Sequence, residues 1–331
     1  MQSVTRKALI DRAAALLADG TVNRVYGWKK GTFAYDVTPA LFESAEELER
    51  DFVFGDFCGA NFSKYLIAET RRKDGKVLVF LKPCDTYSFN QLLTEHRFDR
   101  EKVYAVGVPC EGMADINKIR ELAGDGIAEI ASEGDKLIVH TLFDGDIELN
   151  AAECLAERCK NCKSRRHVAY DELIGEEGDV CENGRFDQVE ALEAMTPDER
   201  FAFWQNELSR CIRCNACRDV CPACTCEKCV FGNPESGVEN KAISDSFEEK
   251  MFHIIRAFHV AGRCTDCGEC SRVCPQHIPL HLLNRKFIHD IDRFYGDYQA
   301  GESVGSRGPL VDYTLTDMEP GDAGKGGGAN A

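Results

Sequence analysis

The stretch from Cys211 to Pro222 reads Cys-Ile-Arg-Cys-Asn-Ala-Cys-Arg-Asp-Val-Cys-Pro, and its cysteine spacing returns from Cys264 to Pro275 as Cys-Thr-Asp-Cys-Gly-Glu-Cys-Ser-Arg-Val-Cys-Pro. A tight loop with a sulfur at every third position can touch three iron corners of one 4Fe–4S cubane. The fourth cysteine, four residues further on, points away and reaches the cluster of the other loop. The proline then ends the loop and removes one backbone donor.

This spacing predicts two clusters with exchanged fourth ligands. The two predicted ligand sets are Cys211, Cys214, Cys217 and Cys274 for one cluster, and Cys264, Cys267, Cys270 and Cys221 for the other. A pair of zinc sites is the alternative, because CxxC pairs also bind zinc. Zinc needs only four ligands per site and rarely shows eight cross-paired cysteines with both prolines, so the pattern favours iron–sulfur clusters.

Helical patterns surround the two loops, at residues 248–260 and 280–294. Together with the cysteine motifs, residues 201–296 resemble the helical dicluster ferredoxin domain of succinate dehydrogenase iron–sulfur subunits and of heterodisulfide reductase subunits. The resemblance implies a mainly α-helical, ferredoxin-like domain that carries two 4Fe–4S clusters.

The first half of the chain has an α/β pattern. A helix is predicted over residues 6–18, and apolar runs at 77–81 and 103–108 are separated by a helical stretch. Strand, helix and strand in this order imply a parallel pair with a crossover helix. Cys84 and Cys110 follow the two strands, at the edge of the sheet where functional groups collect. A third strand is predicted at 136–140, leading towards Cys154.

Three segments of this half resemble the beta subunits of deazaflavin-coenzyme-reducing hydrogenases and of related formate dehydrogenases. They are Lys82-Pro83-Cys84-Asp85, Gly107-Val108-Pro109-Cys110 and Cys159-Lys160-Asn161-Cys162. The resemblance implies that a third 4Fe–4S cluster is held by Cys84, Cys110, Cys159 and Cys162. The alternative is that Cys84 and Cys110 are small buried apolar side chains, as free cysteines often are.

The same resemblance raises the question of a flavin. That family usually opens this domain with a glycine-rich segment that cradles FAD, whereas residues 17–22 here read Leu-Ala-Asp-Gly-Thr-Val, without a glycine pair. No GxGxxG or phosphate-binding GxxxxGK[ST] motif occurs either. FAD is therefore the less favoured of the implied cofactors.

Three more thiols follow the first cysteine loop, in the run CPACTCEKC. Cys224, Cys226 and Cys229 lie within six residues of each other. They predict a further metal centre, either a fourth cluster or a zinc ion, and the remaining cysteines are candidates for its last ligand: Cys58, Cys154 and Cys181. Redox-inactive thiols at a domain interface are the alternative.

Charge and hydropathy exclude several classes of partner. The 331 residues include 56 acidic and 40 basic side chains, and the formal net charge is −16. Nucleic acids and anionic membranes both reward a basic face, so neither is an expected partner. The sequence contains no run of eighteen apolar residues, so a membrane span is not expected. The N-terminus lacks a secretory pattern, and the expected location is the cytoplasm, where clustered thiols usually bind metal.

These observations predict four regions: an α/β domain over residues 1–170, a linker over 171–200, the dicluster domain over 201–298 and a flexible tail over 299–331. The predicted role is that of an iron–sulfur electron-transfer subunit in a multi-subunit anaerobic oxidoreductase. Its expected partners are flavoprotein, hydrogenase, formate dehydrogenase or heterodisulfide reductase-like subunits, or a ferredoxin. The alternative is a flavin-dependent dehydrogenase subunit that itself reduces or oxidises a soluble cofactor.

Overall fold

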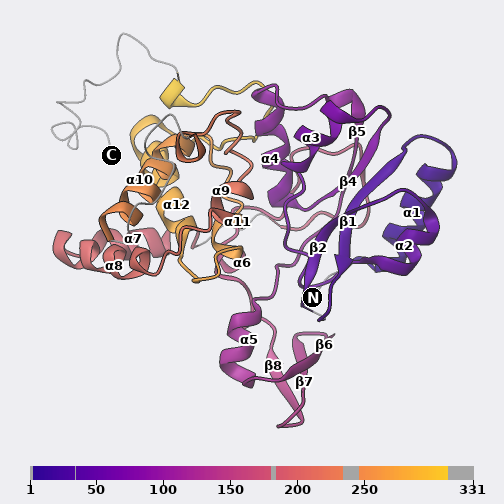
Figure 1. Cartoon of the computed structure of the whole chain (residues 1–331), viewed down its shortest axis with the longest axis horizontal. Coiled ribbons are helices and arrows are strands. Elements are labelled where there is room, and N and C mark those ends of the chain that lie inside the picture. Colours follow the sequence, from indigo (N-terminus) through magenta and orange to yellow (C-terminus); the bar gives the residue numbers. More distant parts are fainter. Residues whose placement is uncertain (1–2, 34, 180–183, 234–245, 312–331) are drawn as a thin grey trace.

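The computed structural model describes residues 3–33, 35–179, 184–233 and 246–311. Figure 1 shows an α/β domain, a helical region that carries the two cysteine loops, and a small separate sheet. The elements of the α/β domain are α1 (Arg6–Ala18), β1 (Arg24–Lys30), β2 (Val37–Phe42), α2 (Ala45–Asp51), β3 (Phe52–Val53), α3 (Tyr65–Arg72), β4 (Val77–Leu81), α4 (Pro83–Thr94), η1 (Arg100–Lys102), β5 (Val103–Gly107) and β9 (Glu172–Leu173).

The main sheet has the strand order β2-β1-β4-β5-β9, and β3 pairs with β1. β1, β4, β5 and β9 run parallel, with Val79 opposite Ala105, whereas β2 and β3 are antiparallel to β1. Every residue of β4 is buried, as expected for a strand covered by helices on both faces. The predicted helix at 6–18 and the predicted parallel pair with its crossover helix are confirmed.

Helices cover both faces of this sheet. In Figure 1, α1 and α2 lie on one side, and α4 lies on the other, between the sheet and the helical region. The apolar residues of α1 recur at helical spacing and belong to the same core as the sheet: Leu9, Ile10, Ala13 and Leu16. On the other face, α4 begins two residues after β4, at the carboxyl end of that strand.

A small antiparallel sheet stands apart from the main one (Figure 1). It consists of β6 (Ile127–Glu133), β7 (Lys136–Thr141) and β8 (Asp146–Asn150), and α5 (Ile116–Ala123) packs against it. The strand predicted at 136–140 therefore exists as β7, but it pairs with its sequence neighbours and not with the parallel strands. The reason is local, because the short turns on either side of β7 favour hairpins.

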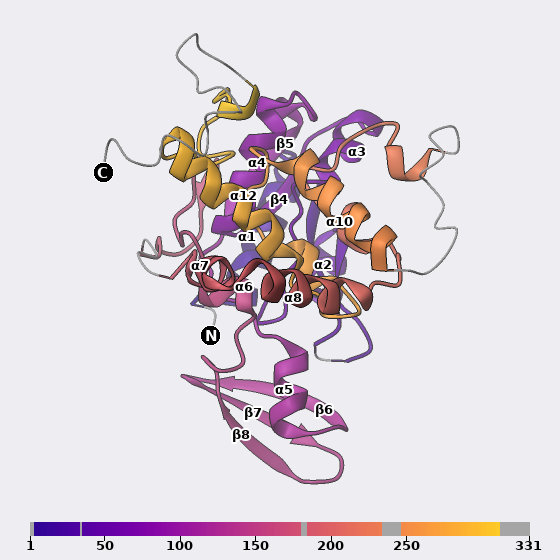
Figure 2. The ribbon, with the colours of Figure 1, turned by 90° about the vertical axis from the view of Figure 1, so that its left-hand side faces the viewer.

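The helical region lies in front of the main sheet in Figure 2. Its elements are α6 (Glu157–Lys160), α7 (Asp187–Ala194), α8 (Pro197–Ser209), α9 (Ala216–Asp219), η2 (Val230–Gly232), α10 (Ser246–Val260), α11 (Glu269–Arg272), α12 (Leu280–Tyr295) and η4 (Pro309–Val311). The helices predicted at 248–260 and 280–294 are α10 and α12. Both contribute to a core that also contains cysteines of the two loops.

The expected linker, which was predicted to run into a helix, and the expected tail both contact the folded part of the chain. Residues 171–200, expected as a linker, include β9 in the main sheet and α7 beside α12. The expected tail begins against α4, because the Gly301 backbone passes so close to Tyr87 that a Cβ would lie 1.8 Å from the Tyr87 carbonyl oxygen. Residues 312–331 of the tail lie outside the described part of the chain.

Candidate iron–sulfur centres

The first candidate centre lies at the carboxyl ends of β4 and β5. Cys84 begins α4 directly after β4, and Cys110 follows β5. Both line one cavity, together with two cysteines from the segment after the small sheet, Cys159 and Cys162. The expectation that the two strand ends bring Cys84 and Cys110 together is confirmed, and the four cysteines implied by the resemblance surround a single space.

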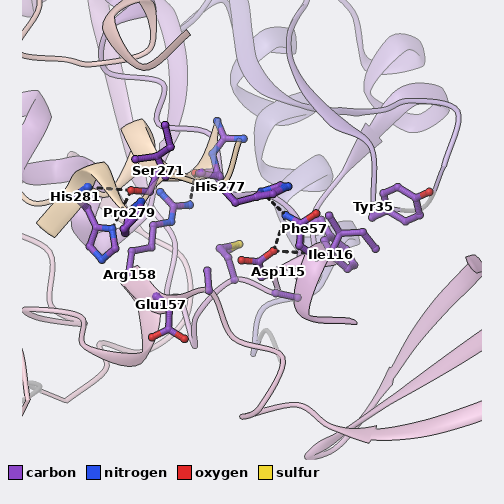
Figure 3. A pocket seen from close by; sticks show the side chains of 17 residues that line it. Tyr35, Phe57, Asp115, Ile116, Glu157, Arg158, Ser271, His277, Pro279 and His281 are labelled. Carbon is purple, nitrogen blue, oxygen red and sulfur yellow. Dashed lines mark hydrogen bonds between the residues drawn. The ribbon is translucent and has the colours of Figure 1, made fainter. Parts of the chain in front are cut away.

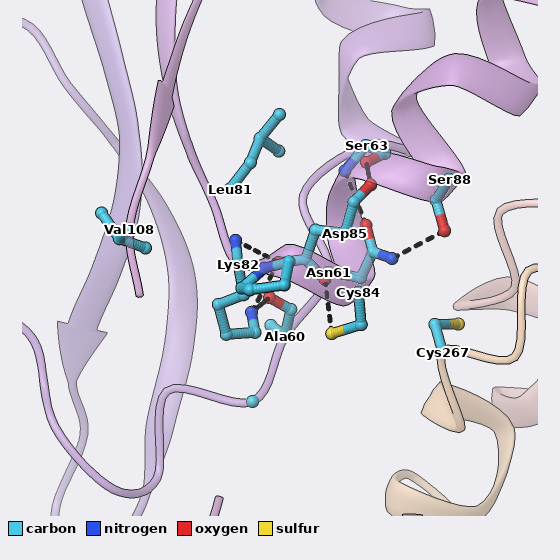
Figure 4. Close-up of polar contacts among 12 residues, drawn as sticks. Ala60, Asn61, Ser63, Leu81, Lys82, Cys84, Asp85, Ser88, Val108 and Cys267 are labelled. Carbon is cyan, nitrogen blue, oxygen red and sulfur yellow. Dashed lines mark hydrogen bonds and ion pairs between the residues drawn. The ribbon is translucent and has the colours of Figure 1, made fainter. Parts of the chain in front are cut away.

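Buried charges accompany these thiols (Figure 4). The Lys82 ammonium donates to the Ala60 carbonyl at 2.9 Å and pairs with the Asp85 carboxylate at 2.7 Å, and both side chains are almost fully buried. Burial raises the pKa of Cys84 well above its ordinary value and that of Cys110 to about 12. These thiols are therefore neutral unless a metal supplies positive charge, and iron binding would release their protons. The donor set and the neighbouring cations fit an iron–sulfur cluster.

The second candidate centre is a cavity within the first cysteine loop. Four of its lining residues are the predicted ligands Cys211, Cys214, Cys217 and Cys274. Two side chains of α10 contact these sulfurs. His253 Nε2 lies 3.3 Å from Cys211 Sγ, and Arg256 Nη1 donates to Cys217 Sγ at 3.2 Å. Such outer contacts would stabilise thiolate charge and tune the potential of a bound cluster.

The third candidate centre is formed by the second loop. Burial raises the pKa of Cys264 to about 12, and it also raises the pKa of Cys270, with Cys267 and Cys264 adding to the effect. Cys221 from the first loop is close enough to Cys267 for the two to interact electrostatically. Cys221 thus lies near enough to the second loop to interact with one of its thiols.

The two loops have matching backbones. Arg213 and Asn215 have left-handed φ angles of +56° and +62°, and Asp266 and Gly268 have +57° and +66° at the same positions of the second loop. A four-residue helix follows each pair, α9 in the first loop and α11 in the second. Left-handed turns direct amide groups towards one side of the chain, as the Arg213 N–H shows by donating to Cys211 Sγ at 3.3 Å. The repeated sequence thus produces a repeated local structure.

Shared residues connect the three centres in a row. Cys267 belongs to the second loop, yet it also lines the cavity of Cys84 and Cys110. Cys270 of the second loop and Cys217 of the first lie in one core. The order is therefore the α/β centre, the second-loop centre and the first-loop centre.

Two buried carboxylates hold the second loop against its surroundings. Glu269 is fully buried and pairs with Arg158 at 2.6 Å and with Arg272 at 2.7 Å. Asp266 pairs with Arg285 at 3.0 Å and with Arg185 at 2.9 Å. Although burial opposes their ionisation, the neighbouring guanidinium groups hold the pKa of each carboxylate at about 2.

The remaining cysteines divide into two groups. Cys224, Cys226 and Cys229 line another cavity, between α3 and α10. Cys58 is buried in the core of the main sheet and Cys154 in the core of the small sheet, and neither lines that cavity. Cys181 lies outside the described residues. Among the described cysteines there is no disulfide.

A further cavity of about 260 Å³ lies where the α/β domain meets the helical region (Figure 3). Its wall includes Met113 and Arg158, which also line the α/β centre, and Ile278, which also lines the first-loop centre. His281 is buried there, with Nδ1 bonded to Ser271 and with no partner for Nε2 among the described residues. This volume is slightly below the range of about 300–1,000 Å³ typical of small-molecule sites.

Sequence reasoning missed the cations beside the sulfurs. Arg263 and Arg272 flank the second loop, but they pair with Glu95 and Glu269. The cations that reach the cysteine segments are Arg158, which donates to the Cys267 carbonyl at 2.8 Å, and Arg256 on α10. Arg158 precedes Cys159, which could have drawn attention to it, but no sequence signal connects Arg256 with a loop nearly forty residues earlier.

Within the described ranges, no three His, Cys, Asp or Glu side chains converge closely enough to hold a single metal ion. The sulfurs of each predicted cysteine group are therefore too far apart to bind one ion together. Four ligands of a cubane bind four separate irons and surround a larger volume than four ligands of one zinc ion.

Comparison with known proteins identifies the class. Residues 207–278 match the family model of the 4Fe–4S dicluster domain. Over 81 residues the chain is 35% identical to a protein described as putative ferredoxin-3 of Sinorhizobium fredii, covering 24% of this chain and 75% of that protein. The chain therefore carries a 4Fe–4S dicluster domain and is an iron–sulfur protein.

More extended similarity links the chain to particular enzymes. It is 24% identical over 326 residues to the beta subunit of the F420-dependent formate dehydrogenase of Methanocaldococcus jannaschii, covering 81% of this chain and 84% of the relative. The beta subunit of the F420-dependent formate dehydrogenase 1 of Methanococcus maripaludis is 25% identical over 280 residues, covering 65% of this chain and 71% of the relative. A chain of the F420-reducing [NiFe] hydrogenase complex of Methanosarcina barkeri aligns with a TM-score of 0.40 and 13% identity, covering 62% of this chain and 86% of that chain. The resemblance to formate dehydrogenase beta subunits and the dicluster domain expected in the second half of the chain are confirmed.

A search of the described helices found none that is both long and apolar enough to span a bilayer.

Proposed function

We propose that this chain is the electron-transfer subunit of a cytoplasmic, multi-subunit oxidoreductase and that it relays single electrons through three 4Fe–4S clusters. The observation that carries the proposal is the row of three cysteine groups, in which Cys267 is shared between the walls of two neighbouring centres. A row of this kind suits sequential transfer between two partners at its ends.

The proposed ligands are the predicted ones, in three groups of four: Cys84, Cys110, Cys159 and Cys162; Cys264, Cys267, Cys270 and Cys221; and Cys211, Cys214, Cys217 and Cys274. A bound cluster supplies reversible one-electron chemistry. The chain's own residues would then set the charge around each cluster and so its potential. Arg256 and His253 contact sulfurs of the first-loop centre. Lys82 and Arg158 place positive charge beside the α/β centre, which would favour the more negative, reduced state.

The partners are proposed from the relatives. Those relatives are beta subunits of F420-dependent formate dehydrogenases, so we place this chain between a flavoprotein, hydrogenase, formate dehydrogenase or heterodisulfide reductase-like subunit and a second carrier such as ferredoxin. The ferredoxin-like character of the helical region belongs to the same proposal. With a formal net charge of −16 before any cluster is added, a partner is expected to present a basic docking face.

Anaerobic purification with iron and sulfide analysis tests the three clusters. The proposal predicts about twelve irons per chain in these sites, and paramagnetic resonance after reduction should show several interacting centres. Cys214→Ala and Cys267→Ala should each remove about four irons, whereas Cys154→Ala, in the core of the small sheet, should remove none. Retention of all iron in the first two variants would contradict the ligand assignment.

A second candidate function is a subunit that itself reduces or oxidises a soluble cofactor at a bound FAD. The cavity of Figure 3 favours it by position, because its walls include residues of both the α/β centre and the first-loop centre. Its volume of about 260 Å³ suits a ring system but does not enclose a whole dinucleotide. One flavin per purified chain, together with cofactor reduction by the isolated chain, would establish this function.

A further inference from the structure

The run CPACTCEKC is not used by the three proposed clusters, apart from its first cysteine. Its other three thiols, Cys224, Cys226 and Cys229, line one cavity of about 520 Å³ between α3 of the α/β domain and α10. This is about twice the volume of the cavity between the domains. The three thiols therefore border a space that is large enough for more than a single ion.

The same cavity is strongly basic. Among the described residues, six cations line it, against two carboxylates, Asp219 and Glu227; the cations are Lys64, Arg71, Arg97, Arg218, Arg256 and Arg263. The chain as a whole carries a net charge of −16, so this concentration of positive charge runs against its composition. A basic cavity in an acidic protein indicates an anionic occupant.

Three of these cations have carboxylate partners. Arg218 pairs with Asp219 at 2.9 Å, Arg263 pairs with Glu95 at 2.6 Å, and Arg71 approaches Glu227 at 3.6 Å. These pairs account for the charge of half of the cations and for both lining carboxylates.

The other three cations have only neutral acceptors among the described residues. Lys64 donates to the Arg218 and Asp219 carbonyls, and Arg97 donates to the Thr225 carbonyl within the cysteine run. Arg256 reaches Cys224 Sγ at 3.8 Å in addition to Cys217, and only 5% of its surface is exposed. The Nε atoms of Arg97 and Arg256 are buried and have no hydrogen-bond partner in the described part of the chain. Arg256 is buried, Lys64 and Arg97 are half-buried, and none of the three pairs with a carboxylate among the described residues. Because removing a cation from water without a counter-charge is costly, these side chains favour an anion in the cavity, with Arg256 shared between it and the first-loop centre.

Three thiols and three cations that pair with no carboxylate of the described residues surround one cavity, and they point to an occupant that binds thiolates and carries net negative charge. An iron–sulfur cluster meets both conditions, because the thiolates outweigh the charge of its core. Zinc fits less well, since a structural zinc site has four ligands and the three sulfurs do not converge on one ion position within the described ranges.

We propose that Cys224, Cys226 and Cys229 hold a fourth iron–sulfur cluster, with Lys64, Arg97 and Arg256 as its charge partners. With three cysteine ligands, it is either a 3Fe–4S cluster or a 4Fe–4S cluster whose fourth iron is not bound by cysteine. It would lie next to the second-loop centre, because the Cys224 backbone N–H donates to the Cys221 carbonyl at 3.1 Å. Cys226 is exposed, so this cluster would form a branch from the middle of the row to the protein surface.

The test uses the full chain, reconstituted anaerobically with iron and sulfide and analysed for iron, sulfide and zinc. The expected content is about fifteen or sixteen irons, since the fourth cluster adds three or four to the twelve of the other sites. Cys226→Ala and Cys229→Ala should each lose about three or four irons, and the matched control Cys154→Ala should lose none. Cys224 is left unchanged because its sulfur contacts Cys221, a ligand of another proposed cluster.

Equal iron in the parent chain and in both variants would overturn the proposal, as would the loss of one zinc without loss of iron. If the alanine variants do not fold, Cys226→Ser and the iron content of the unsubstituted chain answer the same question. Paramagnetic resonance of the oxidised chain distinguishes the two cluster types, because only an oxidised 3Fe–4S cluster is paramagnetic there. Loss of iron in Cys214→Ala and Cys267→Ala tests the three-cluster relay independently of this outcome.

Discussion

The two cysteine loops share a spacing and a backbone but have different surroundings. The first loop packs against α8 and α10, and its Cys214 and Ile212 are exposed. The second loop lies at the junction with the α/β domain, where Ser88 hydrogen-bonds Thr265 at 2.7 Å and Glu269 is fully buried. The motif therefore specifies a binding loop, and the surroundings specify whether that loop lies inside the row of centres or at its end.

The largest expected difference between the loops concerns electron flow. Cys267→Ala should remove about four irons from the middle of the row and stop transfer between the α/β centre and the first-loop centre. Cys214→Ala should remove as many, but it should leave the α/β and second-loop centres reducible by a donor at the α/β end. Iron analysis combined with rapid reduction kinetics distinguishes the two. Uninterrupted transfer in Cys267→Ala would show that the row is not the path.

The next difference is one of stability. Glu269→Gln removes the negative charge between Arg158 and Arg272, and breaking a buried pair of this kind costs about 3–5 kcal/mol. The control in the first loop is Asp219→Asn, which loses an exposed pair with Arg218 worth less than about 1 kcal/mol. Thermal unfolding under anaerobic conditions measures both. Similar losses in the two variants would contradict the contrast in surroundings.

A smaller effect is expected from exchanging the left-handed residues. At Gly268 an added Cβ would lie 2.6 Å from the Cβ of Arg158, so Gly268→Asn should cost about 1–3 kcal/mol through overpacking. The reciprocal change, Asn215→Gly, should be within about 1 kcal/mol, because the first loop already accommodates a side chain at this position. Denaturant unfolding of the two variants measures the difference. A neutral Gly268→Asn would show that the junction is loosely packed.

Acid should weaken the junction of the second loop. The pKa of Glu269 is lowered to about 2 from its ordinary 4.5, so its contribution to stability is complete above about pH 4.5 and is lost as the pH falls towards 2. The rate of cluster loss, followed by visible absorbance, should therefore rise as the pH is lowered through this range, and it should rise less steeply in Glu269→Gln. Identical pH profiles for the two proteins would contradict the prediction.

The smallest expected effect is on redox potential. Arg256→Gln removes a charged donor 3.2 Å from Cys217 Sγ and should lower the potential of the first-loop centre, by an amount on the order of tens of millivolts. Asn284→Leu removes a weaker neutral contact, 3.7 Å from Cys270 Sγ, and should shift the second-loop centre less. Redox titration followed by paramagnetic resonance measures both shifts. A larger shift in Asn284→Leu would reverse the assignment of the stronger sulfur contact.

Local patterns account for the parts of the fold that were predicted from sequence. The helix at 6–18, the strands of the parallel pair and the two long helices beside the loops each follow from apolar periodicity over a short window. The strand at 136–140 was predicted as an element, but its pairing was not, because pairing depends on neighbours that a single strand does not specify. The order within residues 171–179 was missed, since β9 has only two residues and is fixed by the existing edge of β5.

The sequence by itself determined the two cysteine loops, because the four cysteines of each loop lie close together in the chain and the repeated spacing produces the same backbone turns in both. Only the tertiary structure decided what surrounds them. It brought Cys159 and Cys162 to the strand ends that carry Cys84 and Cys110, placed Arg256 against Cys217, and buried Glu269 between two arginines. Contacts between residues distant in the chain depend on how helices and sheets pack, and no local spacing encodes that packing.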